Sequence, residues 1–344
     1  MSRPRMIFWA AALVAVAAAI GYRVRVSREP APPPIPALIF VTGGAEPYWQ
    51  LTIDGARAAA KDNGLDVKIE TPTVNDDLQA QMNILDNLKV DGIGGVAFSP
   101  IDAEGQTALI NSLIERGKKV VTFDSDAPGS NRLSFVGSNN AYAGSNCARL
   151  MQEALPEGGK VAVLLANLTK ENMRARKAGF EEEIAQVRAT DGTSTPSKII
   201  VVGYFEDGGD MEKCAAIIRE QLTKNPDLAG IVGMNARHGP TLLKVLGELK
   251  KLDQVKLVTF DDAAETLDGI EAGHIFATMA QDPYQYGYQS VVSLASLCRG
   301  EETSIPIVGR GSLYVNAEPI RQKNVKEYRT RIEGRKKPMK AKAG

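Results

Sequence analysis

The chain is 344 residues long, 24% charged and 44% hydrophobic, which is enough for two domains with separate cores. Its 41 basic and 41 acidic residues cancel, but both ends are basic: residues 1–36 hold five basic and one acidic residue, and residues 321–344 hold ten and two. The body between them has 26 basic and 38 acidic residues, a net charge of −12, which excludes a nucleic-acid-binding surface as its main function.

Residues 1–36 have the pattern of an export segment followed by a spacer. Arg3 and Arg5 precede an apolar run at 7–20, whose length suits a signal peptide and is short for a membrane span. Basic residues follow the run directly, so cleavage and retention as a membrane anchor both stay open. Five prolines between 30 and 36 predict a stiff spacer. We therefore expect an exported protein of the periplasm or cell envelope.

From residue 37 onward, strands and helices alternate, which predicts parallel sheets covered by helices on both faces. The series occurs twice, so we expect an α/β protein with two similar Rossmann-like lobes, each a doubly wound parallel sheet. The expected strands are 38–42, 67–70, 93–98, 120–124, 160–165, 199–204, 228–233 and 255–261. The expected helices are 49–63, 76–88, 104–116, 141–154, 173–186, 211–223, 240–250 and 285–297.

The lobes are expected to exchange chain segments through a multi-strand hinge. The N-terminal lobe is predicted to comprise 37–138 and 282–312, and the C-terminal lobe 139–281 and 313–325. Crossings are expected near 138–139, at 261–264 or 281–282, and near Asn316. Residues 326–344 are strongly basic and are predicted to form a disordered tail.

The tetrapeptide Val-Thr-Phe-Asp occurs twice, ending at Asp124 and at Asp261. Each copy is an apolar run typical of a buried parallel strand, and ligands of open α/β sheets bind beyond the carboxyl ends of such strands. The repeat therefore predicts two carboxylates that face one ligand across a cleft between the lobes. The alternative is that each aspartate caps a helix.

Cysteine and histidine give no sign of a metal site. Cys147, Cys214 and Cys298 are widely spaced, so they form either one disulfide or buried thiols on helix faces. His238 and His274 are the only histidines, and neither is near a cysteine in the sequence. We expect no metal and no cofactor.

An enzymatic function is not supported. Gly43 and Gly44 follow the first strand, but the Gly-x-Gly-x-x-Gly pattern of dinucleotide sites is absent. With two histidines in the chain, no pairing of a nucleophile with a base stands out. Residues 1–36 are also unable to form the DNA-binding headpiece of a transcription regulator.

Six short segments, in this order, closely resemble the ribose-binding-protein family of periplasmic sugar receptors. They are Gly-Gly-Ala-Glu-Pro-Tyr-Trp at 43–49, Phe-Asp-Ser-Asp-Ala at 123–127, Arg-Lys-Ala-Gly-Phe at 176–180, Met-Asn at 234–235, Phe-Asp at 260–261 and Ala-Gln-Asp-Pro at 280–283. The resemblance runs from about 37 to about 320. It implies the type I periplasmic binding protein fold and a monomeric solute-binding protein that delivers a sugar to an ABC permease. The alternative partner is a chemoreceptor or sensor kinase that reads the bound sugar.

The resemblance also implies the binding residues. Tyr48 and Trp49 are expected to stack on the apolar face of a sugar, with packing at the helix start as the alternative. Arg176 is expected to reach into the cleft while Arg174 stays on the surface. The full expected set is Thr42, Glu46, Tyr48, Trp49, Asp124, Ser125, Arg176, Asn235, Asp261 and Gln281.

Four positions depart from the family pattern, one of them Ala236, which follows Asn235 where an acidic residue is frequent. Glu46 stands where the family often has asparagine, and Ser125 stands where the ribose receptors have arginine. Gly209 replaces a stacking aromatic, for which Phe205 is the candidate substitute. The pocket therefore loses an arginine and gains a carboxylate, which argues against ribose and leaves a monosaccharide or related polyol as the expected ligand.

Overall fold

The computed structural model describes residues 14–18, 21–22, 34–89, 91–185, 197–301 and 311–336. The chain divides into two units, Met1–Ile35 and Pro36–Gly344. In the first unit, residues 14–18 and 21–22 are helical, and the rest of the predicted export segment lies outside the described residues. No helix in the described part of the chain has the length and apolarity needed to cross a membrane.

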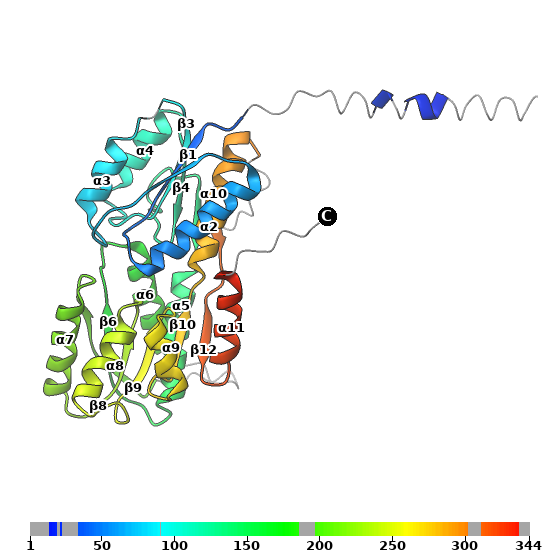
Figure 1. Cartoon of the computed structure of the whole chain (residues 1–344). Helices are drawn as coiled ribbons and strands as arrows, with labels where there is room; N and C mark the ends of the chain where they lie inside the picture. Colours follow the sequence, from blue (N-terminus) through cyan, green and yellow to red (C-terminus); the bar gives the residue numbers. More distant parts are fainter. Residues whose placement is uncertain are drawn as a thin grey trace, which may run out of the picture. The chain divides into compact units, whose positions relative to one another are not determined.

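The second unit contains two α/β lobes (Figure 1). The strands of the N-terminal lobe are β1 (Ala37–Val41), β2 (Val67–Glu70), β3 (Ile93–Phe98), β4 (Lys119–Phe123), β5 (Ser134–Gly137) and β11 (Ser312–Tyr314). Those of the C-terminal lobe are β6 (Gly159–Leu165), β7 (Ile199–Glu206), β8 (Leu228–Gly233), β9 (Lys256–Phe260), β10 (Ala277–Ala280) and β12 (Glu318–Arg321).

Across the described residues, the two sheets have six strands each and the same order. It is β11-β5-β4-β3-β1-β2 in one lobe and β12-β10-β9-β8-β6-β7 in the other. All neighbours are parallel except β12, which runs antiparallel to β10. The predicted α/β architecture of two similar lobes is confirmed, and β4 and β9, which carry the repeated tetrapeptide, occupy the same place in their sheets.

Helices cover both faces of each sheet, as parallel strands buried on two sides require. In the N-terminal lobe they are α2 (Pro47–Asn63), α3 (Leu78–Asp86), α4 (Thr107–Glu115) and α10 (Pro283–Arg299). In the C-terminal lobe they are α5 (Asn140–Ala154), α6 (Glu171–Ala185), α7 (Met211–Lys224), α8 (His238–Glu248), α9 (Ala264–Glu271) and α11 (Val325–Lys336).

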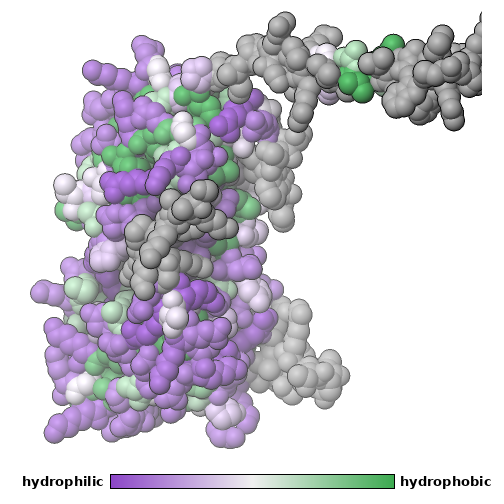
Figure 2. Space-filling view, turned by 45° about the vertical axis from the view of Figure 1, so that its right-hand side comes forward, coloured by the Kyte–Doolittle hydropathy of each residue, from purple (hydrophilic) through white to green (hydrophobic). Residues whose placement is uncertain are grey.

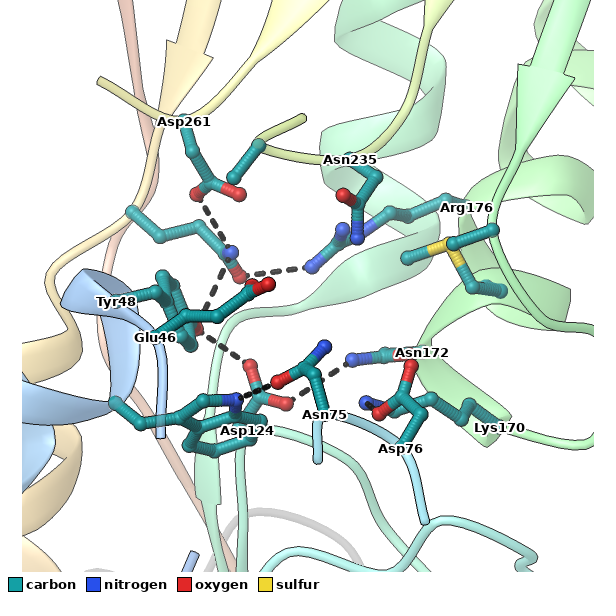
Figure 3. Close-up of a pocket in the computed structure, with 15 residues that line it drawn as sticks. Glu46, Tyr48, Asn75, Asp76, Asp124, Lys170, Asn172, Arg176, Asn235 and Asp261 are labelled. Atoms are coloured by element: carbon teal, nitrogen blue, oxygen red, sulfur yellow. Dashed lines mark hydrogen bonds and ion pairs between the residues drawn. The ribbon is translucent and has the colours of Figure 1, made fainter. Parts of the chain in front are cut away.

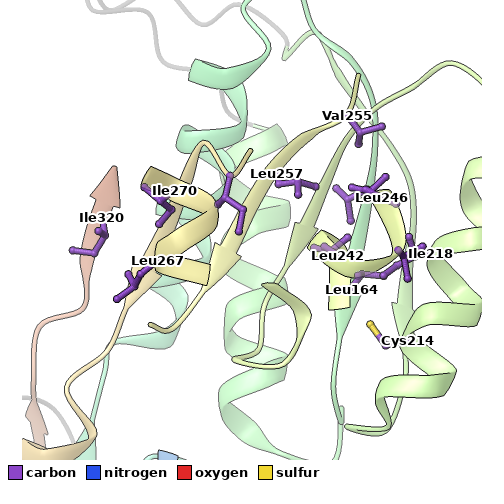
Figure 4. Packing of buried hydrophobic residues seen from close by; sticks show 14 of the residues in the cluster. Leu164, Cys214, Ile218, Leu242, Leu246, Val255, Leu257, Leu267, Ile270 and Ile320 are labelled. Atoms are coloured by element: carbon purple, nitrogen blue, oxygen red, sulfur yellow. The ribbon is translucent and has the colours of Figure 1, made fainter. Parts of the chain in front are cut away.

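The C-terminal lobe has a core on each side of its sheet. On one side, Ile218 of α7 and Leu242 and Leu246 of α8 pack against Leu257 of β9 (Figure 4). On the other side, residues of α5 and α6 pack against the same sheet. Helices packed on both faces of the sheet thus fix the carboxyl ends of its strands. A binding site at those ends needs this rigidity.

One pair of helices in each lobe packs at very short range, and glycine makes this possible. A Cβ atom on Gly144 of α5 would lie 2.0 Å from the carbonyl oxygen of Arg176 in α6, and one on Gly179 would lie 1.9 Å from that of Ala141. Gly55 of α2 and Gly287 of α10 allow the same approach in the other lobe. The contact between α5 and α6 brings Arg176 close to the start of α5.

In the described part of the chain, three segments cross between the lobes. Ser138 and Asn139 join β5 to α5, Gln281 and Asp282 join β10 to α10, and residues 315–317 join β11 to β12. The alternative crossing at 261–264 is wrong, because that segment leads from β9 to α9 within one lobe.

Two expectations about the C-terminal part of the chain need correction. Residues 312–314 form β11, which pairs with β5, so residues 313 and 314 belong to the N-terminal lobe. The predicted disordered tail is wrong for 326–336, which lie in α11. Val325 and Tyr328 are buried there, and the Tyr328 hydroxyl donates to Asp262 Oδ2 at 2.7 Å. Residues 337–344 lie outside the described residues.

Candidate functional site: the pocket between the lobes

A polar pocket lies where the strands of both lobes end (Figure 3). Eight of the ten predicted binding residues line it, and they come from both lobes. The lining residues are Glu46, Tyr48, Trp49, Asn75, Asp76, Asp124, Ala166, Lys170, Asn172, Met173, Arg176, Asn235, Ala236, Asp261 and Gln281.

Asp124 and Asp261 each follow directly on a central strand and share an unusual backbone conformation. Their φ angles are 61° and 63°, in the left-handed region that residues other than glycine seldom adopt. Neither caps a helix, since the helices that follow are capped by Asn139 and by Ala263. The helix-cap interpretation is therefore wrong, and both buried carboxylates lie on the pocket wall.

Asp124 is held by neutral hydrogen-bond donors from both lobes. Its Oδ1 accepts from the Tyr48 hydroxyl at 2.5 Å, and its Oδ2 accepts from Ser99 Oγ at 3.2 Å and from Asn172 Nδ2 at 3.3 Å. Burial and the Asp124 charge raise the pKa of Tyr48 well above its usual value, so this phenol stays protonated and donates. Asn172 belongs to the C-terminal lobe, so this carboxylate links the two halves of the pocket.

Asp261 accepts fewer hydrogen bonds than Asp124, and its ionised form is less well stabilised. Its Oδ1 accepts from Gln281 Nε2 at 2.8 Å. Burial raises the pKa of Asp261 to about 7, and the charges of Asp262 and Asp124 add to this, although Arg176 and Gln281 oppose it. The ionised form of Asp261 is therefore disfavoured relative to that of an exposed aspartate.

Arg176 is fixed at the base of the pocket by contacts along its whole guanidinium. Its Nε donates to Asn140, and its two terminal nitrogens donate to the Met234 carbonyl and to Gln281 Oε1, each at 2.9 Å. The guanidinium carbon lies 3.8 Å from the centre of the Phe260 ring. Its side chain is almost fully buried, whereas that of Arg174 is 39% exposed, and of the two arginines it is Arg176 that lines the pocket.

Gln281 joins these groups from a crossing segment. Its amide oxygen accepts from Arg176 and its amide nitrogen donates to Asp261, so one side chain links the arginine to the carboxylate. The Tyr286 hydroxyl also donates to this oxygen at 3.1 Å and hydrogen-bonds with Ser138, which lies on another crossing. The pocket and two of the three interlobe crossings therefore share one hydrogen-bonded network.

Trp49 is both a pocket wall and a core residue. It packs edge-on against Phe123 with 6.4 Å between ring centres, and its indole N–H donates to Asn75 Oδ1 at 2.6 Å. Tyr48 lies perpendicular to it, at 5.2 Å. Phe205 packs in the C-terminal core and does not line the pocket, so its expected role as the missing aromatic is wrong.

Contacts between the lobes close the mouth of the pocket. Lys170 forms an ion pair with Asp76 at 2.9 Å, and Arg237 forms one with Glu46. Burial lowers the pKa of Lys170, but the carboxylates of Asp76 and Asp124 outweigh this and raise it, so the ion pair persists at neutral pH. Thr169 adds a hydrogen bond to the Ile101 carbonyl at 2.9 Å. The structure thus has the two lobes closed on one another.

Two predicted residues do not line the pocket. Thr42 is fully buried, and its hydroxyl donates to the Gly44 carbonyl at 2.8 Å. Ser125 is also fully buried beside Asp124.

The lining residues missed by the sequence analysis come mainly from the loops after β2 and β6. Asn75 and Asp76 follow β2, while Lys170, Asn172 and Met173 lie at the start of α6. The rule that polar residues gather beyond the carboxyl ends of strands would have suggested Asn75 and Asp76. No local signal marks Lys170 as the partner of a residue 94 positions earlier.

The cysteines are free thiols, which excludes the disulfide alternative in this structure. Burial raises the pKa of Cys147 to about 12, so its thiol is inert. Cys214 lies beside His238 and Asp207, with one potential ligand atom from each within 4.8 Å of the others. These residue types are able to bind a transition metal, but hydrogen bonds within the group, including His238 to Asp207 at 2.8 Å, account for their arrangement.

Two similar lobes, three crossings and a buried polar pocket between the lobes define a two-lobed solute-binding protein. The model of the family described as "Periplasmic binding protein domain" matches residues 37–302, so the chain belongs to this family, and the predicted resemblance is confirmed. The family consists of binding proteins, and membership implies a periplasmic location.

Individual relatives agree with this assignment. The D-allose-binding periplasmic protein of Escherichia coli (strain K12) is 24% identical over 251 residues, covering 71% of this chain and 78% of that protein. The arabinose-binding protein AraP from Geobacillus stearothermophilus is 30% identical, with a TM-score of 0.69, over 86% of this chain and 99% of AraP. An ABC transporter solute-binding protein from Burkholderia graminis C4D1M, solved with D-arabinose, is 26% identical, with a TM-score of 0.76, over 87% and 99%.

Proposed function

We propose that this exported protein captures a monosaccharide or related polyol between its lobes and delivers it to an ABC-type sugar importer. The observation that carries the proposal is the pair of buried carboxylates, Asp124 and Asp261, presented by equivalent strand ends of the two lobes. One solved relative is named as an arabinose-binding protein and another was solved with D-arabinose, which supports a sugar as the ligand.

The chemistry of the pocket suits a ligand with many hydroxyl groups. A sugar presents hydroxyls in fixed directions and apolar C–H faces, so its receptor needs polar groups held rigidly beside an aromatic surface. Asp124 and Asp261 accept hydrogen bonds, Asn235 can donate and accept, and Trp49 supplies an aromatic wall. Arg176 and Gln281 hold the acceptors in place through their mutual contacts.

Closure is the step that connects binding to delivery. The ion pair between Lys170 and Asp76 and the link from Asn172 to Asp124 form only when the lobes meet. The closed form therefore presents a surface made from both lobes, which an ABC permease can distinguish from the open form. We infer that the protein acts as a monomer, which fits the face in Figure 2, where hydrophilic residues predominate and hydrophobic ones form small groups.

A thermal-shift panel of monosaccharides and polyols on the purified protein tests the proposal. A ligand that binds only the folded state stabilises it by RT ln(1 + [L]/Kd), about 2.7 kcal/mol at one hundred times Kd. We expect a saturable rise in the melting temperature with at least one compound. If no compound raises the melting temperature, the proposed function is wrong.

A further inference from the structure

The pocket wall carries more negative than positive groups. Among the lining residues in the described ranges, four are carboxylates and two are cations. The carboxylates are Glu46, Asp76, Asp124 and Asp261, and the cations are Lys170 and Arg176. The contacts of the two cations determine which of the four carboxylates form no direct ion pair.

Both cations, and two of the carboxylates, are engaged within the protein. Lys170 pairs with Asp76 at 2.9 Å, with both side chains nearly buried. Glu46 pairs with Arg237. The three guanidinium nitrogens of Arg176 donate hydrogen bonds to oxygen atoms of Asn140, Met234 and Gln281, which are all neutral groups. Asp124 and Asp261 are left outside these ion pairs.

The hydrogen bonds to these two aspartates come from neutral donors in the described part of the chain. Asp124 receives three, from Tyr48, Ser99 and Asn172, spread over both of its oxygens. Asp261 receives one from Gln281 on Oδ1, so most of its acceptor capacity stays unused. Burying a carboxylate without a direct ion pair is costly: burial raises the pKa of Asp261 to about 7, although the nearby charge of Arg176 acts to lower it.

We propose that the ligand of this pocket carries an amino group, as an amino sugar or an aminated polyol does, and that its ammonium group pairs with Asp261. The inference rests on the proposed function and narrows its ligand class. An ammonium group supplies both a directly paired positive charge and the hydrogen-bond donors that the free oxygen of Asp261 lacks. The second carboxylate, Asp124, adds attraction without a direct ion pair.

Matched sets of ligands test the proposal by titration calorimetry at pH 7.5. Each set contains a neutral compound, its amino derivative and its N-acetylated amine, which keeps the nitrogen but removes the charge. The sets are built on glucose, galactose, mannose and inositol. We expect the amine to bind at least about tenfold more tightly than both neutral forms in at least one set, as a charge-assisted hydrogen bond gives.

Two variants locate the effect. Asp261→Asn keeps the shape of the side chain and should reduce the preference for the amine to within about threefold. Asp253→Asn removes an exposed carboxylate of the same lobe, 95% exposed, and should leave the preference unchanged. An unchanged preference in Asp261→Asn would overturn the proposed pairing.

The outcomes separate this proposal from the proposed function. If a neutral compound binds as tightly as its amine, or more tightly, in every set that shows binding, the aminated ligand is wrong and the sugar-binding function stands. If no compound of any set binds, the aminated ligand is wrong, and the wider thermal-shift panel decides the sugar-binding function.

Discussion

Asp124 and Asp261 occupy the same position in two copies of one fold, each one residue beyond the third strand of a six-stranded sheet. Both adopt a left-handed backbone conformation, with φ angles of 61° and 63°. Such a conformation costs on the order of 1 kcal/mol for a residue with a Cβ, so it persists where the surrounding structure imposes it. The strain turns each carboxylate from the end of its strand into the pocket, which makes the pair the centre of the proposed binding site.

Removing either carboxylate should abolish most ligand binding and leave the fold intact. Truncating a buried, charge-assisted partner of a ligand costs about 2–4 kcal/mol, roughly thirty-fold to nearly a thousand-fold in Kd. Titration calorimetry on Asp124→Ala and Asp261→Ala checks this, with circular dichroism as the control for folding. Wild-type affinity in both variants would exclude these residues from the site.

Asp261→Asn should stabilise the ligand-free protein at pH 8 and have little effect near pH 4. The folded-state pKa of about 7 lies above the ordinary value of 3.8, so folding penalises the ionised form. The penalty is absent below 3.8, grows as the pH rises towards 7 and is complete above 7, where it reaches about 4 kcal/mol. The titratable groups that face Asp261 are Arg176, Asp124, Asp262, Tyr48, Tyr286, Cys147 and Tyr328.

Urea unfolding of the wild type and of Asp261→Asn at pH 4 and pH 8 measures this difference. If the variant gains the same stability at pH 4 and at pH 8, ionising Asp261 in the folded protein has no free-energy cost, and the prediction is wrong. Asp253→Asn serves as the control, because its carboxylate is 95% exposed and its contact with His274 at 3.8 Å should contribute less than about 1 kcal/mol at either pH.

Ligand binding should change the fluorescence of Trp49. The chain has two tryptophans, and Trp9 lies in the predicted export segment. The Trp49 ring lines the pocket and lies 5.5 Å from the Lys170 ammonium, so a ligand that enters changes its surroundings. Emission spectra of Trp9→Phe with and without saturating ligand isolate the Trp49 signal. An unchanged spectrum, together with unchanged affinity in Trp49→Phe, would remove this residue from the site.

Ligand should shift the lobes towards the closed state, because only that state makes all the contacts. Small-angle scattering should therefore give a smaller radius of gyration at saturating ligand. Lys170→Met removes the ion pair to Asp76 across the pocket mouth and should enlarge the ligand-free protein or weaken binding. Lys177→Met, which removes an ion pair within α6, is the matched control. A free protein already as compact as the bound one would contradict closure by the ligand.

Much of this architecture follows from local sequence patterns. The apolar runs that end at Asp124 and Asp261 are strands because continuous Val and Phe segments suit a sheet buried on both faces. The alternation of strands and helices then requires parallel sheets, whose carboxyl ends gather polar residues. Asp124, Asn235, Asp261 and Gln281 line the pocket for this reason, whereas Glu46, Tyr48, Trp49 and Arg176 were expected from the family resemblance.

Other features depend on contacts that no local pattern contains. Lys170 meets Asp76 across 94 residues, and His238 meets Asp207 and Cys214, because packing of the lobes and helices brings them together. Residues 326–336 have the composition of a solvated tail, yet they form a helix. Its Tyr328 is buried and donates a hydrogen bond to Asp262, which anchors the helix on the lobe. Sequence periodicity predicted the main series of strands and helices, but not β5, β10, β11, β12, α9 or α11. Only the tertiary structure decided which side chains meet, and so which of the pocket's charges are paired, because ion pairing depends on distances of a few ångströms between remote segments.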